Sequence, residues 1–451
     1  MVSKKKVKTM DELLEEAIVP AEKQPYKLPE DWEWVKLGVL LDSLQYGYTE
    51  SATHEKIGPH FLRITDLDDE INWDDVPYCT IAEENFLKYK LNHNDIVVAR
   101  MGSVGKSQII KNPEDSVFAS YLIRLVPNNL LLADYLALFM KTSLYWTQIE
   151  QNSKGTTRAN VNTQGLKNLI VPLPPIIEQK NIIVKSTDLL TKIKHAGKLI
   201  EEAKETFELR RAGFLEQVFK FEYHYLYQKD VNNIKTNEIF DFVTSGSRGW
   251  AKYYSDSGDI FIRVGNLKHD SISLQLDEIQ YVCLPENAEG KRTEVQAGDI
   301  LVSITADIGR IAVIEEGMQK AYINQHIALA RPKKHFYSPY IGWYLAAKTG
   351  GNQQMMELQR GATKVGLGLN DIKNITIPVP TYEQQKEIAE FIEKKLKEFG
   401  KSEWFLETCL KQCDELKKSI LQKAFKGELS TNNPNDELAI DLLKSILREK
   451  L

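Results

Sequence analysis

The sequence lacks any apolar run long enough to cross a membrane. Its longest nearly apolar stretch, Leu130 to Met140, is interrupted by Asp134 and is far shorter than the roughly 18 residues that a span needs. The basic start around Lys5 is followed by acidic residues rather than by an apolar core, so it is not a secretory signal. We therefore expect a cytoplasmic protein.

Cysteine and histidine are scarce and scattered. The four cysteines, at positions 79, 283, 409 and 413, show no metal-ligand spacing and imply no disulfide framework. The eight histidines do not cluster at ligand spacings either. We expect no metal site, and we interpret Cys409 and Cys413 as small apolar fillers within a helix.

Motifs for catalysis and for cofactor binding are missing too. There is no Asn-Pro-Pro-aromatic methyltransferase signature, no glycine-rich Rossmann loop and no Gly-x-Ser-x-Gly. The stretch Gly102 to Ser107 looks like a phosphate loop, but Arg100 occupies the place of its first glycine. The matching stretch at 306–311 has neither lysine nor serine. We expect no catalytic and no cofactor-binding residue, although the sequence alone does not exclude an enzyme.

An excess of positive charge is also absent. The formal net charge is −5 at pH 7, whereas a chain that binds nucleic acid unaided is usually basic. The composition, 42% hydrophobic and 27% charged, is that of a folded soluble chain of two or three domains. Any nucleic-acid binding must therefore use local basic patches or the charge of a partner.

What the sequence does contain is one long helical pattern that occurs twice. Mostly apolar residues recur at alternating spacings of four and three, which is typical of a coiled coil. One copy alone would fit an ordinary amphipathic helix equally well, but two copies in one register favour the coiled coil. The two seams are Ile182, Ser186, Leu189, Ile193, Ala196, Ile200, Ala203, Phe207, Arg210 and Phe214, then Ile388, Ile392, Lys395, Phe399, Ser402, Leu406, Cys409, Cys413, Leu416 and Ile420, 206 residues later.

Both helices begin in the same way. Val171-Pro-Leu-Pro-Pro precedes the first and Ile377-Pro-Val-Pro-Thr the second, and proline bars helix before that point. Some 45 residues at about 1.5 Å each give a rod of roughly 65 Å. No other part of the chain can set so long a distance.

The repeat extends over the segments before each helix. Val35 to Gly47 matches the sequence 199 residues later, Phe61 to Leu67 matches at 200, and Asn94 to Val97 matches at 204. The offset between matching segments grows from 199 to 206 along the domain, and small loop insertions in the second copy account for this growth. Short apolar runs predict strands, and one helix is expected near Asp134 to Gln151, with its counterpart near Pro339 to Leu358.

The chain therefore divides into an ordered set of segments. We predict a tail with a short helix capped at Thr9 (1–28), a strand-rich domain (29–175), a spacer helix (176–220), a linker (221–233), a second strand-rich domain (234–381), a second spacer helix (382–427) and a tail helix with Leu438, Leu442 and Ile446 on one face (428–451). If the two copies are equivalent, the simplest arrangement relates them by a pseudo-two-fold axis. The two helices then run antiparallel, with one domain at each end. The tail would then return to the amino-terminal segment.

Recognition is the function that the residue types permit. Arginine reads guanine, asparagine and glutamine read adenine, and threonine and lysine fix phosphates. Arg63 and Arg263 could equally form internal ion pairs, and that alternative stays open. The candidate DNA-binding residues are Tyr48, Arg63, Arg100, Lys106, Lys154, Thr157, Arg158, Arg248, Arg263, Asn266, Thr305, Arg310 and Lys364.

The duplicated architecture resembles the specificity subunit of type I restriction-modification systems. The resemblance lies in the Pro-Leu-Pro-Pro-like step, the Glu/Gln-Gln-Lys start, and the helix closing on Gln-x-Val/Ala-Phe-Lys. Leu28 to Leu37, Ala99 to Lys106 and Ala424 to Leu429 are also similar to that family. The resemblance implies an α+β fold in which two long antiparallel coiled-coil helices separate two target-recognition domains. Each domain would read one half of a split double-stranded DNA site.

The resemblance also implies partners. Two modification subunits that bind S-adenosylmethionine would dock on the helices, with restriction subunits that use ATP and Mg²⁺ outside them. This chain itself would hold no cofactor and would be non-catalytic. The alternative is a scaffold or adaptor that binds only protein, for which the helices alone would suffice.

Overall fold

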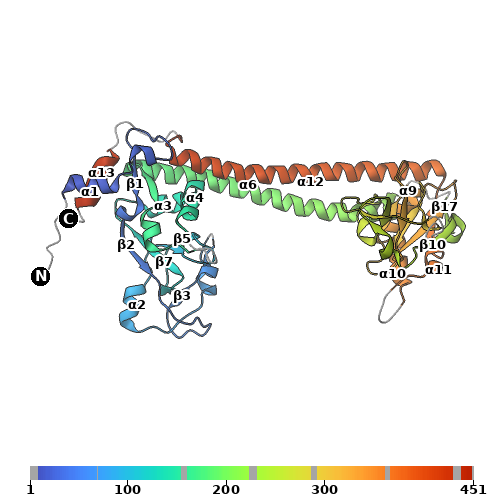
Figure 1. The fold of residues 1–451 in the computed structure, drawn as a ribbon, viewed down its shortest axis with the longest axis horizontal. Helices are drawn as coiled ribbons and strands as arrows, with labels where there is room; N and C mark the ends of the chain where they lie inside the picture. Colours follow the sequence, from blue (N-terminus) through green and yellow to red (C-terminus); the bar gives the residue numbers. More distant parts are fainter. Residues whose placement is uncertain are drawn as a thin grey trace. The chain divides into compact units, whose positions relative to one another are not determined.

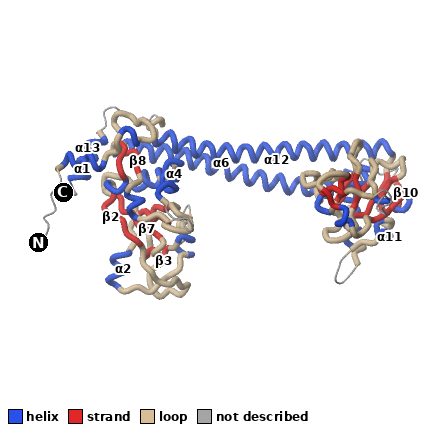
Figure 2. Tube along the Cα trace, in the orientation of Figure 1, coloured by secondary structure: helices blue, strands red, loops and turns tan. Residues whose placement is uncertain are grey.

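The computed structural model describes residues 9–68, 70–153, 160–222, 231–285, 292–360, 366–429 and 438–448. The chain forms two compact units (Figure 1). The first unit holds Met1–Leu199 with Cys409–Leu451, and the second holds Ile200–Thr408. Each unit combines a strand-rich domain with segments of two long helices (Figure 2).

The first unit has a four-stranded antiparallel sheet of order β2-β7-β4-β5. Residues of β4 alternate between two hydrophobic cores, Ile96 and Val98 in one, Val97 and Ala99 in the other, because successive side chains of a strand point to opposite faces. β3 pairs in parallel with β6, and β1 pairs antiparallel with β8. The strands are β1 (Glu33–Lys36), β2 (Leu41–Tyr46), β3 (His60–Leu62), β4 (Ile96–Ala99), β5 (Ser107–Ile109), β6 (Ser116–Phe118), β7 (Leu122–Pro127) and β8 (Ile170–Leu173).

The second unit repeats this topology. Its main sheet has the order β10-β17-β14-β15, β12 pairs in parallel with β16, and β9 pairs antiparallel with β18. β2 begins at Leu41 and β10 at Phe240, 199 residues later, so the predicted internal repeat is confirmed. The strands are β9 (Asn232–Lys235), β10 (Phe240–Ser245), β11 (Tyr254–Ser255), β12 (Asp259–Ile262), β13 (Gln280–Val282), β14 (Ile300–Ser303), β15 (Ile311–Val313), β16 (Ala321–Ile323), β17 (Ile327–Pro332) and β18 (Thr376–Val379).

Each strand-rich domain has two helices where the sequence predicted one. Thr142 ends the first stretch because its side chain accepts a hydrogen bond from the Tyr145 N–H and caps a new helix. In the second unit the second helix begins after Gly350 without a side-chain cap, and a Cβ at Gly350 would lie 2.7 Å from the Tyr344 carbonyl oxygen. The helices of the two domains are α2 (Glu83–Tyr89), α3 (Ala133–Phe139), α4 (Ser143–Asn152) and α5 (Thr163–Lys167), then α8 (Thr236–Ile239), α9 (Ser338–Ala346), α10 (Gly351–Glu357) and α11 (Leu369–Ile372).

The long helices α6 (Ile176–Gln217) and α12 (Tyr382–Phe425) run antiparallel within the second unit. The Phe207 ring lies 5.2 Å from that of Phe399, and the Phe214 ring lies 5.9 Å from that of Phe391. Later residues of α6 thus meet earlier residues of α12. The α+β class with paired long helices is confirmed, whereas the pseudo-two-fold closure stays a prediction.

The contact seam differs from the predicted one in detail. Gly197, Lys204 and Arg211 are half-buried, whereas the predicted positions Ala196, Ala203 and Arg210 are exposed. The seam thus steps by four residues twice in succession after Leu189, because a straight helix drifts relative to a strict seven-residue repeat. In α12 the same slip leaves Leu416 53% exposed and Lys417 half-buried.

The end of each long helix packs on a strand-rich domain with a phenylalanine. The Phe425 ring lies 5.0 Å from the Tyr135 ring and 5.4 Å from the Phe139 ring. In the second unit Phe219 lies in the π-helical turn Val218–Glu222 that continues α6, and its ring lies 6.0 Å from the Tyr340 ring. Each domain is therefore held by the start of one long helix and by the end of the other.

The two terminal helices pack against each other in the first unit. Helix α1 (Met10–Ala17) begins with the predicted capping box of Thr9 and Glu12. Helix α13 (Ala439–Arg448) buries Leu442 and Ile446, in the same core as residues of α1. Leu438 lies before the helix and is 50% exposed, so its predicted place on the apolar face is wrong.

A buried glutamine in the first turn fixes each long helix to its domain. Gln179 is fully buried; its Oε1 accepts from the Leu132 N–H at 2.9 Å, and its Nε2 donates to the Pro174 carbonyl at 3.2 Å. The matching Gln385 accepts from the Tyr337 N–H at 2.9 Å. The pair of glutamines belongs to the shared Glu/Gln-Gln-Lys start.

Gln179→Ala is expected to lower the free energy of unfolding of the first unit by about 1–3 kcal/mol, because buried backbone groups lose their partner. Urea denaturation followed by circular dichroism measures this loss. Gln353→Ala is the control, since Gln353 is exposed and its side chain donates to Glu357 at 2.9 Å and to no other residue that the structure describes. If the two variants lost equal free energy of unfolding, the bonds of Gln179 would not be what fixes the helix to the domain.

Candidate nucleic-acid interface

In the second unit three strands end at one place. Arg263 follows β12 and Asn324 follows β16, and these strands pair in parallel with Ile262 opposite Ile323. The Asn324 N–H donates to the Ile262 carbonyl at 3.1 Å. The loop after β14 joins them, because the Ile304 N–H donates to the carbonyl of His326 at 2.9 Å. Side chains from separate parts of the sequence therefore meet at these strand ends.

These strand ends surround a hollow of about 510 Å³, which we call the strand-end hollow; it is lined by Arg263, Asn266, Asp277, Ala306, Asn324 and His326, among others. Ala306 has a φ of 70°, a conformation that costs a non-glycine residue about 1 kcal/mol or more. Gly102 holds the matching position of the first unit, with a φ of 74°.

Arg263 is exposed at the edge of the strand-end hollow and has no ion pair to another described residue. Its backbone N–H donates to Oδ1 of Asn266 at 2.9 Å. The amide nitrogen of Asn266 donates to the carbonyls of Gln275 at 2.9 Å and Glu278 at 3.2 Å. Asn266 thus shapes the turn without placing a charge beside the arginine.

The first unit has the same turn with a carboxylate in it. Asp66 accepts from the Arg63 backbone N–H at 2.8 Å and from the Arg63 side chain at 3.0 and 2.8 Å. The hydrogen bond to Asp66 raises the pKa of Arg63. The internal ion pair that the sequence left open for both arginines therefore forms at Arg63, while Arg263 forms none with the described residues.

The other candidates of the first unit are already engaged within it. The Arg100 guanidinium lies 4.6 Å from the centre of the Tyr46 ring, and its Nε donates to Asn160 at 3.5 Å. Lys106 lies 3.8 Å from Asp68, with its side chain 42% exposed. The half-buried Tyr48 packs 5.4 Å from the Tyr89 ring. Lys106 has the weakest tie of the three, so it is the most available for a phosphate.

Arg310 is the most constrained candidate of the second unit. Its Nε donates to Asp307 at 2.6 Å and its NH1 to the Leu267 carbonyl at 2.9 Å. Burial raises the pKa of Asp307, but hydrogen bonds from Arg310 and His269 outweigh burial and leave that pKa lowered. Arg310 therefore holds its own loop together.

Two further candidates lie near the strand-end hollow or on the surface. Thr305 bonds Nδ1 of His326 at 2.6 Å, and Arg248 is exposed with no partner among the described residues. The remaining candidates, Lys154, Thr157, Arg158 and Lys364, lie outside the described residues.

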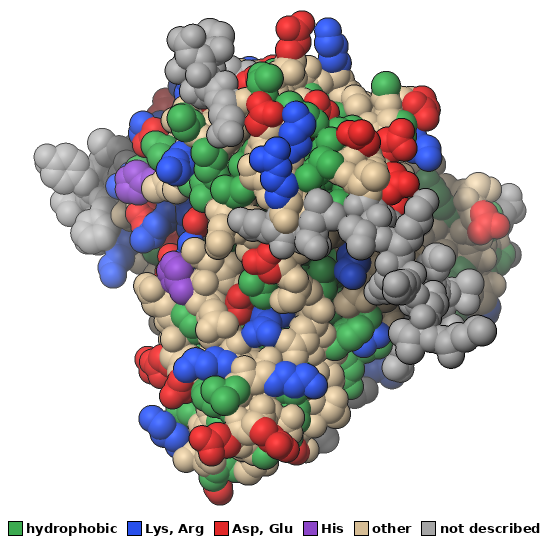
Figure 3. All heavy atoms as spheres, turned by 90° about the vertical axis from the view of Figure 1, so that its left-hand side faces the viewer, with side chains coloured by type: hydrophobic (Ala, Val, Ile, Leu, Met, Phe, Trp, Pro, Cys, Tyr) green, Lys and Arg blue, Asp and Glu red, His purple; other side chains and the backbone are tan. Residues whose placement is uncertain are grey.

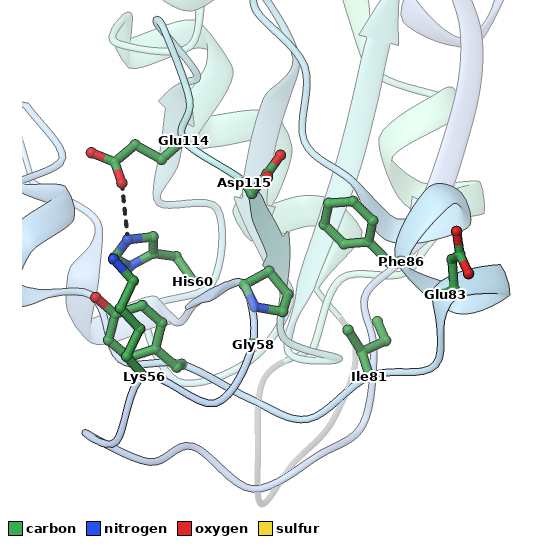
Figure 4. Close-up of a pocket in the computed structure, with 10 residues that line it drawn as sticks. Lys56, Gly58, His60, Ile81, Glu83, Phe86, Glu114 and Asp115 are labelled. Atoms are coloured by element: carbon green, nitrogen blue, oxygen red, sulfur yellow. Dashed lines mark hydrogen bonds and ion pairs between the residues drawn. The ribbon is translucent and has the colours of Figure 1, made fainter.

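A second hollow, of about 530 Å³, lies in the first unit (Figure 4). His60 is buried in its wall, with its ring tilted by 34° to the Tyr78 ring at 4.5 Å between centres. Its ring nitrogens lie 2.9 Å from the Val76 carbonyl and 3.2 Å from Glu114. Asp115 lines it as well. Its carboxylates make it a poor site for a phosphate. Sequence reasoning missed this hollow and the Asn324 and His326 of the other one, because their residues come from separate segments without a shared motif.

Positive charge is not gathered into one broad area on the face that Figure 3 shows, where Lys and Arg side chains alternate with Asp and Glu. Among the described residues no three His, Cys, Asp or Glu side chains are arranged to hold a metal ion. No described helix is both long and apolar enough to traverse a bilayer.

The fold defines a class of protein with two copies of a strand-rich domain, each followed by a long helix. The model of the type I restriction modification DNA specificity domain matches the chain twice, over residues 29–205 and 220–401. The chain therefore belongs to the type I restriction-modification DNA specificity family. The function expected from the resemblance, a DNA-specificity subunit of a type I restriction-modification complex, is confirmed over the alternative of a scaffold.

Named relatives and solved structures agree. The specificity subunit of the type I restriction enzyme EcoKI from Escherichia coli is 24% identical over 391 residues, which cover 80% of this chain and 82% of the relative. The EcoBI specificity subunit of Escherichia coli is 24% identical over 333 residues, covering 68% and 70%. The crystal structure of the HsdS subunit from Thermoanaerobacter tengcongensis has a TM-score of 0.63 at 18% identity, covering 90% of this chain and 99% of that one.

A further structure has the same fold. A chain from a study of complex assembly and conformational transition in the type I restriction-modification system has a TM-score of 0.69 at 19% identity, covering 90% of this chain and all of that one. Relatives of this chain are thus subunits of larger complexes.

Proposed function

We propose that each strand-rich domain reads one half of a bipartite double-stranded DNA site and that this chain supplies recognition without catalysing a reaction. One observation carries this proposal: the same turn occurs twice with different side chains, Arg63 with Asp66 and Arg263 with Asn266. The two domains share the backbone of this turn but differ in its polar side chains. Such a difference is expected of two domains that read different bases.

Chemistry then belongs to partner subunits. Two modification subunits would supply S-adenosylmethionine, and restriction subunits would supply ATP and Mg²⁺, while this chain holds no cofactor. The net charge of −5 supports this division, because partners with basic surface would provide much of the attraction to the phosphate backbone.

Retention on DNA tests the proposal. The purified chain, with and without its modification subunits, is passed over immobilised duplexes of random and host sequence. We expect sequence-specific retention only when the modification subunits are present. Absence of sequence-specific retention in the complete complex would contradict the reading of a bipartite site, and binding of S-adenosylmethionine by the isolated chain would count against a non-catalytic role.

Docking of two modification subunits predicts matched contacts on the two long helices. Leu199 of α6 and Phe405 of α12 are 51% and 61% exposed, at positions 206 residues apart in the repeat. Exposed apolar side chains of this kind often anchor a protein interface. Leu199→Ser and Phe405→Ser should each remove one modification subunit, and the double variant should remove both.

Light scattering of the mixed subunits measures these stoichiometries, with two modification subunits per unaltered chain as the expected value. Leu87→Ser is the control, because Leu87 is 73% exposed on the short helix α2. A saturated complex of one modification subunit with the unaltered chain would refute two-sided docking.

A further inference from the structure

The strand-end hollow of the second unit offers hydrogen-bond donors that the fold leaves unused. Arg263 has the same backbone position as Arg63 in the first unit. The residue three positions later, Asn266, is uncharged, and its side-chain amide donates to two backbone carbonyls. The backbone of Arg263 is therefore held at the end of β12, and no described residue accepts from the five N–H donors of its exposed guanidinium.

A second donor lies in the same wall. Asn324 is only 8% exposed, and its Oδ1 accepts from the backbone N–H of His326 at 3.1 Å. Its Nδ2 group bonds no described residue. The His326 ring is fixed by Thr305 at 2.6 Å and by Gln325 at 2.8 Å, so it forms a rigid wall beside that amide.

Part of the rim of the hollow is acidic. Asp277 and Glu278 line the same hollow and are exposed, and Asp277 accepts from the Gln275 amide at 2.7 Å. Two carboxylates disfavour a phosphate, which is itself an anion. They suit an amino group, such as N4 of cytosine, that donates hydrogen bonds.

We propose that the strand-end hollow reads a G·C base pair, with Arg263 donating to O6 and N7 of the guanine. Guanine is the base that offers two acceptors side by side in the major groove, whereas adenine and cytosine present an amino donor there. This assignment rests on the proposed function and adds a base and the side chain that reads it.

The test uses the complex of this chain with its modification subunits and duplexes that carry the methylation motif mapped for the unaltered complex. Each guanine of the half-site read by the second domain is replaced in turn by 7-deazaguanine, which lacks the N7 acceptor. One such replacement should weaken binding to the unaltered complex and leave binding to the Arg263→Ala complex unchanged. Arg263→Ala itself should lower affinity for the motif by about 5- to 150-fold.

Asn266→Asp is the second variant, because it should recreate the ion pair of Arg63 with Asp66 and withdraw Arg263 from the base. It should reproduce most of the loss while the half-site of the first domain stays intact. Asp66→Asn is the matched control and should not alter the second half-site. Thermal unfolding of all three variants reports whether they fold, and the 7-deazaguanine series on the unaltered complex needs no variant.

Several results would overturn the assignment. One is that the half-site of the second domain contains no guanine. Another is that no 7-deazaguanine replacement weakens binding. A third is that Arg263→Ala lowers the affinity equally for matched and mismatched duplexes. The last result would make Arg263 a phosphate contact. A bipartite motif for the unaltered complex keeps the proposed function standing in each case, so the two failures are distinguishable.

Discussion

Phe425→Ala is expected to lower the free energy of unfolding of the first unit by about 3–5 kcal/mol, the usual cost of removing a buried aromatic ring. Phe425 is 2% exposed and packs on the rings of Tyr135 and Phe139. The hydroxyl of Tyr26 also donates to its carbonyl at 3.0 Å. The loss should be large because this ring joins the end of α12 to the strand-rich domain.

Urea denaturation measures the loss, and hydrogen exchange locates it in the first unit. Phe405→Ala on the same helix is the control, since Phe405 is 61% exposed and should change the unfolding free energy by less than about 0.5 kcal/mol. If both variants unfold alike, the end of α12 does not hold the domain as described.

A four-residue insertion near Ala203, with a matching one near Cys409, is expected to change the spacing between the recognised half-sites. It adds about 6 Å of helix and about 40° of phase. Duplex DNA rises about 3.4 Å and turns about 34° per base pair. The added helix length therefore corresponds to nearly two base pairs, and the added rotation corresponds to about one. The half-sites should keep their sequences while the unspecified gap lengthens by one or two.

Sequencing of methylated adenines in a strain that carries the double insertion measures the new gap. An insertion in the linker at 221–233 is the control, because it should not lengthen either helix, and its gap should be unchanged. An active complex with lengthened helices and the original gap would show that the helices do not set the spacing.

The repeat made much of this fold predictable. Offsets of 199 to 206 residues located matching strands in both units, and the proline-rich steps located the starts of both long helices. Local features also held, such as the capping box at Thr9. These features depend on short-range chemistry, which the sequence displays directly.

Features that depend on tertiary contacts were not predictable in the same way. The cap at Thr142 is local, but the periodic pattern did not show it. The half-buried Lys204 bonds Glu407 of α12 at 3.1 Å, a contact that a strict seven-residue repeat does not predict. Whether an arginine pairs with an acid three residues on depends on the turn between them. The sequence shows an acid three residues after Arg63 and an amide three residues after Arg263, but only the folded turn brings Asp66 back to the Arg63 side chain.

The strand-end hollow was the least predictable feature. Its donors Arg263 and Asn324 are 61 residues apart, and only the parallel pairing of β12 with β16 brings them together. Arg263 lies in a segment of the repeat and was a candidate from the sequence, whereas Asn324 was not. A donor array of this kind becomes visible only when the strand order is known.

Mapping methylated adenines in host DNA, with the gene for this chain present and deleted, tests the central claim most directly. The account predicts one bipartite motif, two defined halves with a fixed unspecified gap, whose methylation disappears with the gene. A continuous motif, or a bipartite motif that survives deletion, would contradict the claim that the two strand-rich domains of this chain choose the DNA sequence.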